Sequence, residues 1–224
     1  MTPGDRLPSE RTMCAEFSVS RVTLRAGLAS LVEQGAIESR AARGWFVAGS
    51  RVDTPAGSLQ SFTDAARAYG LNVSSIVRLC HVRPATWDEA TALRIGPGAA
   101  VFELRRIRLL NGLRVAIDHT RIPHALVPGL ETKDFATASL YDSLRSMNPA
   151  VVPAVADYSV DAVQASSEDA ALLEAAVGDP LLLATQTTFD TEGRPIELGR
   201  TLYRGDRYRF RARIAAISQG AGRV

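Results

Sequence analysis

SRVTLRAGLASLVEQG (residues 20–35) decides the fold of the N-terminal part of the chain. Ser20 is a residue type preferred at a helix N-cap, and Gly35 is typical of the position just past a helix C-terminus. Between them, apolar side chains recur at the spacing of one helix face: Leu24, Leu28, Leu31 and Val32. The stretch therefore predicts an amphipathic helix over residues 21–34.

The flanking sequence extends this helix into a larger motif. Residues 8–17 begin with Pro8-Ser9, which suits a turn and an N-cap, and continue with residues compatible with a helix. Two helices separated by so few residues are typical of a helix-turn-helix, whose second helix enters the DNA major groove. Residues 36–40 and 44–47 are predicted strands joined by a basic turn, which is the pattern of a wing.

Charge is unevenly distributed along the chain. Residues 1–51 hold seven arginines against five acidic residues, whereas residues 52–224 hold nineteen basic and nineteen acidic residues. A basic excess at one end favours contact with nucleic acid there.

Several other classes of protein are disfavoured by the composition. There is no run of eighteen apolar residues and no signal peptide, so we expect a cytoplasmic protein without a membrane partner. Cys14 and Cys80 lie far apart and are interpreted as reduced thiols. We expect no metal and no cofactor.

The remainder of the chain predicts an α+β domain. Residues 48–58 are small, polar and interrupted by proline, as in a linker. Predicted helices lie at 59–69, 87–95, 139–147 and 167–176, and β-rich runs at 73–84, 100–110, 114–122, 151–163, 181–190 and 195–204. Asn111-Gly112 and Glu192-Gly193 each separate two β-rich runs, which indicates hairpins and an antiparallel sheet. The order helix, Gly-Pro or Gly-Asp-Pro turn, hairpin occurs twice and suggests internal duplication.

Three stretches, 7–11, 19–25 and 43–47, together resemble the winged helix-turn-helix of the GntR family of regulators. The rest of the chain resembles the UTRA effector domain of its HutC subfamily, through residues 61–63, 139–141, 193–197 and 202–210. The resemblance implies a DNA-binding domain over 1–48, a linker over 49–58 and an effector domain over 59–215. That domain is expected to be an antiparallel sheet flanked by helices, similar to chorismate lyase but used for binding.

The resemblance also implies which residues meet DNA. Arg11 and Arg21 are expected to contact guanines or phosphates, because a guanidinium binds guanine O6 and N7 bidentately. Thr23 and Arg25 would assist them. The complete set of expected DNA-binding residues is Ser9, Glu10, Arg11, Ser20, Arg21, Thr23, Arg25, Arg43 and Gly44.

Two features depart from the family pattern. Ala42 stands where family wings commonly carry glycine, and its methyl group narrows the approach to the minor groove. In the family a further helix precedes the stretch matching residues 4–8. The first helix is therefore expected to be missing, because the true start lies upstream or the sequence is truncated. Leu24, Leu28 and Leu31 would then lack one wall of their core.

Arg106 and Arg108 are the expected centre of the effector site. They are two residues apart on a predicted strand, so they project from one face and favour an anion. By resemblance, the site also includes Asp118, Ser139, Tyr141, Glu197 and Tyr203. Asp118 and Glu197 can accept hydroxyl or amine hydrogens of a ligand, or neutralise the arginines. Family ligands are often phosphorylated sugars, amino acids or related metabolites, and the two arginines favour an acidic or phosphorylated one.

These features predict a repressor controlled by a small molecule, bound as a homodimer to a short palindromic double-stranded operator. An enzyme is not expected, since His81, His119 and His124 have no companions at catalytic or metal-binding spacing. The alternative is a metabolite-binding module without DNA-binding output, because the winged helix is truncated.

Overall fold

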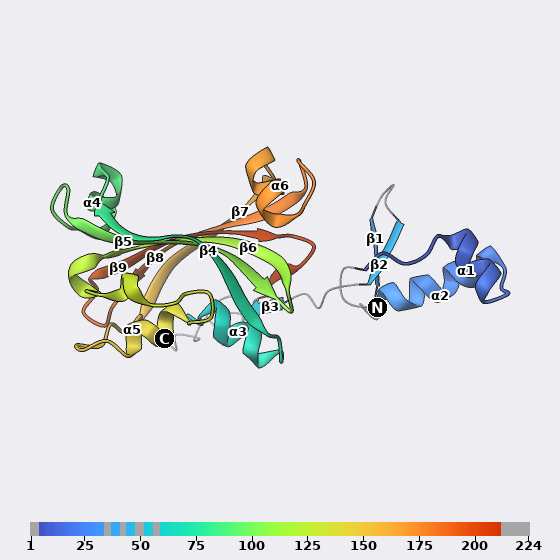
Figure 1. Cartoon of the computed structure of the whole chain (residues 1–224), viewed down its shortest axis with the longest axis horizontal. Coiled ribbons are helices and arrows are strands. Elements are labelled where there is room, and N and C mark those ends of the chain that lie inside the picture. The colour runs from blue at the N-terminus through green and yellow to red at the C-terminus, as the bar shows by residue number, and fades with distance from the viewer. Residues whose placement is uncertain (1–4, 34–36, 41–43, 48–51, 56–58, 212–224) are drawn as a thin grey trace, which may run out of the picture. The chain divides into compact units, whose positions relative to one another are not determined.

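The computed structural model describes residues 5–33, 37–40, 44–47, 52–55 and 59–211. The chain divides into two compact units, residues 1–52 and 53–224, and each is considered by itself (Figure 1). No helix in the described ranges is long and apolar enough to cross a membrane.

The N-terminal unit contains the predicted helix-turn-helix and wing. Helices α1 (Glu10–Glu16) and α2 (Arg21–Glu33) are joined by a turn in which Ser18 has a φ of 54°. Strands β1 (Ile37–Arg40) and β2 (Gly44–Val47) pair antiparallel as the wing. Both helices begin with serine caps: Ser9 Oγ accepts the Thr12 amide and Ser20 Oγ accepts the Thr23 amide, each at 3.1 Å.

The core of this unit is small. Its buried apolar side chains are Met13, Leu24, Leu28 and Ile37. Leu31 and Val32, predicted to share the face of Leu24, are 39% and 41% exposed because no described element covers the end of α2. An apolar hollow of about 580 Å³ runs along this face, between α1 and α2. The predicted apolar stripe is thus buried over only half its length.

The C-terminal unit is built on a six-stranded antiparallel sheet in the order β4-β5-β6-β9-β8-β7. Its strands are β4 (Val73–Pro84), β5 (Ala100–Leu110), β6 (Leu113–Pro123), β7 (Val155–Gln164), β8 (Pro180–Phe189) and β9 (Pro195–Arg204). Asn111 and Gly112 both have positive φ, 48° and 80°, as a two-residue hairpin turn requires. Both predicted hairpins and the antiparallel α+β fold are confirmed.

Helices cover both faces of the sheet. Helices α4 (Trp87–Leu93) and α6 (Ser167–Leu173) lie on one face, and α3 (Phe62–Ala68) and α5 (Leu140–Arg145) lie on the other (Figure 1). Two 3₁₀ turns, η1 (His124–Leu126) and η2 (Leu130–Thr132), follow β6. The main core packs the sheet against α5 and the turns before it through Phe102, Leu104, Ile122, Phe135, Leu144 and Ile196.

The sheet contains a structural repeat that matches the duplication seen in the sequence. β4-α4-β5-β6 and β7-α6-β8-β9 follow the same order, and their last strands meet at the centre of the sheet. The C-cap residues of α4 and α6 are Arg94 and Glu174, and both are left-handed, with φ of 53° and 52°.

Part of the predicted linker is ordered as a strand. Val52–Pro55 forms β3, which pairs with β10 (Tyr208–Arg211) in a two-stranded sheet. Neither short strand was predicted, because four residues are too few to show a periodic pattern. Residues 52–55 of the predicted linker therefore form a short strand.

Candidate functional site

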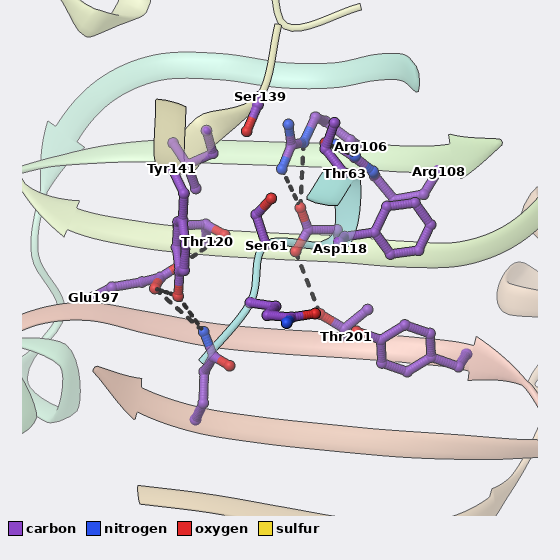
Figure 2. A pocket seen from close by; sticks show the side chains of 15 residues that line it. Ser61, Thr63, Arg106, Arg108, Asp118, Thr120, Ser139, Tyr141, Glu197 and Thr201 are labelled. Carbon is purple, nitrogen blue, oxygen red and sulfur yellow. Dashed lines mark hydrogen bonds and ion pairs between the residues drawn. The ribbon is translucent and has the colours of Figure 1, made fainter. Parts of the chain in front are cut away.

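A pocket opens on the face of the sheet that carries α3 and α5. It brings together all seven residues expected at the effector site, from β5, β6, β9 and the start of α5 (Figure 2): Arg106, Arg108, Asp118, Ser139, Tyr141, Glu197 and Tyr203. The strand alternation inferred from the sequence places Arg106 and Arg108 side by side, as expected.

The sequence analysis missed other residues that line the pocket: Gln60, Ser61, Phe62, Thr63, Thr120, Leu140, Gln186 and Thr201. Strand alternation would have found two of them. Thr120 follows Asp118 by two residues, and Thr201 precedes Tyr203 by two. Ser61 caps α3 through its Oγ, which accepts the Asp64 amide at 3.0 Å. Gln186 carries no sequence signal, since a lone glutamine on a strand is ordinary.

Arg106 and Asp118 form an ion pair within the pocket. Arg106 is 3% exposed and donates from Nε and Nη2 to Asp118 Oδ2, at 3.2 and 2.5 Å. Thr201 Oγ1 donates to Asp118 Oδ1 at 3.3 Å (Figure 2). Within the described part of the chain, Arg106 Nη1 is buried without a hydrogen-bond partner. The ion pair therefore leaves one guanidinium nitrogen free to bind a ligand.

Arg108 is a buried cation that forms no ion pair with any described residue. It is 2% exposed, Nη2 donates to Thr63 Oγ1 at 3.0 Å, and the guanidinium lies 4.5 Å from the centroid of the Phe62 ring. Among the described residues, no carboxylate forms an ion pair with Arg108, and its Nε has no hydrogen-bond partner. Burial, and then the charge of Arg106, lower the Arg108 pKa to about 9. This end of the pocket is thus electrostatically suited to an anion.

Glu197 forms the opposite end of the pocket. It is 2% exposed, and three donors converge on Oε2: the Tyr141 hydroxyl at 2.9 Å, Thr188 Oγ1 at 2.9 Å and Gln186 Nε2 at 3.2 Å. Oε1 receives only Thr120 Oγ1, at 3.5 Å. Burial raises the pKa of Glu197. Burial and the Glu197 charge also raise the pKa of Tyr141. The phenol therefore keeps its proton and acts as a hydrogen-bond donor to Glu197.

The remaining two expected residues support the pocket in different ways. Ser139 caps α5, its Oγ accepting the Asp142 amide at 3.3 Å. Tyr203 stacks on Tyr208 of β10 with ring centroids 4.1 Å apart. Tyr208 in turn lies 6.2 Å from the Phe62 ring, centroid to centroid. The pocket wall is therefore continuous with β10.

The expected DNA-binding residues on α1 and α2 and at their caps fall into three groups. Arg11, Arg21 and Thr23 are exposed, whereas Ser9 and Ser20 act as helix caps. Glu10 accepts from Arg25 Nε at 3.0 Å and from Trp45 Nε1 at 3.2 Å, which ties α1 to α2 and β2.

Two of the expected DNA-binding residues belong to the wing. Gly44 has a φ of 100°, a conformation that favours glycine, and the Arg6 guanidinium lies beside it. Arg43 lies outside the described residues.

Comparison with known proteins gives consistent matches over both units. Residues 1–47 match the bacterial regulatory proteins of the gntR family, and residues 68–209 match the UTRA domain. The HTH-type transcriptional repressor PhnF of Mycolicibacterium smegmatis is 34% identical over 219 residues, covering 95% of this chain and 85% of that protein. The HTH-type transcriptional repressor NagR of Bacillus subtilis is 30% identical over 210 residues, covering 94% and 86%.

The solved structures agree. The crystal structure of PhnF from Mycobacterium smegmatis aligns with a TM-score of 0.73 at 32% identity, covering 97% of this chain and 95% of that one.

Proposed function

The chain belongs to the GntR family of bacterial transcription regulators, in the HutC subfamily with a UTRA effector domain. We propose that a small anionic metabolite, bound by Arg106 and Arg108, controls its affinity for an operator. The family and the relatives are regulators rather than enzymes. The match over residues 1–47 also disfavours a metabolite-binding module without DNA binding.

The observation that carries this proposal is the buried charge of Arg108, with which no described carboxylate forms an ion pair. A phosphate or carboxylate group placed between the arginines can accept from Arg108 Nε and Arg106 Nη1, which are buried without a hydrogen-bond partner among the described residues. Hydroxyl or amine hydrogens of the same ligand can be accepted by Asp118 and Glu197. The pocket therefore supports an acidic or phosphorylated metabolite as the effector.

Thermal unfolding in inorganic phosphate tests the anion site. A ligand that binds only the folded state raises the melting temperature, so phosphate should stabilise the wild type more than chloride at equal ionic strength. Arg108→Gln should remove that difference. Arg200→Gln is a matched control, because Arg200 is exposed on β9 and does not line the pocket. Equal stabilisation of wild type and Arg108→Gln would contradict the assignment.

On the DNA side, we propose that Arg11 and Arg21 contact a palindromic operator, with the protein bound as a homodimer. Both arginines are exposed, and Arg21 opens α2, whose equivalent in helix-turn-helix proteins enters the major groove. A two-fold protein would read two equivalent half-sites. Fluorescence anisotropy with duplexes tiled from upstream of the gene, at two salt concentrations, identifies the operator. Flat, salt-insensitive signals for every duplex would oppose the proposal.

We further propose that the aromatic stack behind Arg108 carries the signal. Phe62 contacts the Arg108 guanidinium, Tyr208 lies next to Phe62, and Tyr208 belongs to β10, which pairs with β3. Only residues 48–51 separate β3 from the wing strand β2 along the chain. An anion that neutralises Arg108 would alter its contact with Phe62 and so the packing of β10 and β3. Release of DNA on ligand binding is the expected direction.

A further inference from the structure

The effector pocket contains two buried ionisable side chains of opposite type, Arg108 and Glu197, and no ion pair joins them. Arg106 is paired with Asp118. Arg108 and Glu197, both 2% exposed, have no ion-pair partner in the described ranges. An anionic group would compensate Arg108 but would leave Glu197 as it is. A ligand that also carries a positive group at Glu197 would compensate both side chains.

The structural repeat shows how this asymmetry arises. Arg106 lies twelve residues after the left-handed Arg94, and Gln186 lies twelve residues after the left-handed Glu174, so they occupy equivalent positions. Arg106 faces Asp118 across its hairpin, whereas Gln186 faces Gly199. One half of the sheet thus has an ion pair where the other half has an amide and a glycine.

Gly199 allows Gln186 to reach Glu197. A Cβ on Gly199 would lie 2.7 Å from Gln186 Cγ, so only glycine leaves the glutamine side chain room to cross β9. Gln186 Nε2 then donates to Glu197 Oε2, and it also lies 3.3 Å from both Tyr141 Oη and Thr188 Oγ1. These neutral donors hold the carboxylate in place without supplying a positive charge.

The two oxygens of Glu197 differ in how well they are satisfied. Oε2 receives three hydrogen bonds of 2.9–3.2 Å, whereas Oε1 has a single contact at 3.5 Å. Burial raises the pKa of Glu197, which favours the protonated acid in the empty pocket, and a positive group beside Oε1 would favour the carboxylate. Oε1 is therefore the open acceptor, and a protonated amine is the group that meets both its hydrogen-bond and its charge requirement.

We infer that the effector is a zwitterion, with its acidic group at Arg106 and Arg108 and a protonated amine at Glu197 Oε1. This inference rests on the proposed function, since it takes the anion site as given. Asp118, which binds Arg106, and Thr120, which contacts Glu197, are two residues apart on β6. That step is roughly 7 Å, which sets the approximate separation of the two ligand groups.

Three matched probes test the inference by calorimetry at pH 7: 3-aminopropyl phosphate, 3-hydroxypropyl phosphate and propyl phosphate. They share the phosphate and the chain length and differ at the far end. The wild type should bind the amine at least tenfold more tightly than either of the others. In Glu197→Gln, which keeps the size of the side chain and removes its charge, the ratio of the amine to the hydroxyl affinity should fall to near one.

Arg108→Gln should weaken all three probes by similar factors. Equal wild-type affinities for the three probes would overturn the zwitterion while leaving the anion site intact, and this comparison needs no variant to fold. If none of the three binds, the inference also falls. The phosphate-dependent melting shift then shows whether the anion site falls with it.

Discussion

Arg83 and Arg108, on opposite faces of the central sheet, differ in how their charge is matched. On the face of α4, Arg83 donates to both oxygens of Glu89 at 2.7 Å and to Glu103 at 2.6 and 3.0 Å. On the face of α3, Arg108 has a threonine and a phenyl ring as neighbours. A guanidinium matched by its own carboxylates contributes to the stability of the fold. One that is buried without them marks a place for a ligand.

The largest effect should come from replacing each arginine by methionine. Arg83→Met leaves Glu89 and Glu103 without their main partner and should lower the free energy of unfolding by about 1–3 kcal/mol. Arg108→Met removes an uncompensated charge from the interior and should raise the free energy of unfolding of the unliganded protein by about 1–3 kcal/mol. Urea denaturation measures both. Comparable losses in the two variants would show that Arg108 serves the fold.

Exposed arginines of the N-terminal unit provide a third case. Arg21→Ala should weaken operator binding by about 10–100-fold, as expected for the loss of a bidentate base contact. If Arg21 instead meets a phosphate, the salt slope of log K should fall by about one. Arg67→Ala is a suitable control. Arg67 is also exposed, but both it and its ion-pair partner Asp142 belong to the C-terminal unit. An Arg21 variant that binds as the control does would argue against this contact.

The coupling between pocket and operator should depend on the stack behind Arg108. Tyr208→Leu keeps an apolar side chain at a buried position but removes the ring that lies against Tyr203 and Phe62. Coupling free energies are typically about 1–3 kcal/mol, and we expect this variant to lose most of that effect. The affinity for the phosphate probes, measured by calorimetry, and the affinity for the operator without a probe should both change less than the coupling free energy does. A variant with full coupling would show that the signal takes another route.

Acid should weaken the paired face by a smaller amount. Hydrogen bonds from Arg83 lower the pKa of Glu89 to about 2, so its contribution to stability is complete above the ordinary value of 4.5 and is lost as the pH falls toward 2. Glu89→Gln, which can still cap α4, should cost about 1 kcal/mol at pH 7. Urea midpoints at pH 7, 4.5 and 3 should show wild type and variant converging. A constant difference across this range would contradict the assignment.

Much of the fold could be predicted because its signals are local. Ser9 and Ser20 are N-cap residues that predict the starts of their helices. Asn111-Gly112 predicts a hairpin between two long β-rich runs. The short strands β3 and β10 escaped prediction because their pairing joins segments far apart in sequence. Exposure of Leu31 and Val32 could not be predicted either, since it depends on what packs against α2.

The pocket shows the same division. Residues that the family resemblance and strand alternation point to, such as Arg106 and Arg108, come together as expected. Gln186 could not be found in this way, because its place beside Glu197 depends on the register of β8 against β9 and on the space at Gly199. Nor does the sequence reveal that Asp118 pairs with Arg106 and leaves Arg108 alone.

The most direct test of the central claim is operator affinity by fluorescence anisotropy, with and without saturating inorganic phosphate at constant ionic strength, in wild type and Arg108→Gln. The account predicts a change of roughly 5–150-fold in the wild-type dissociation constant and none in the variant. An identical response to phosphate in both proteins would contradict it.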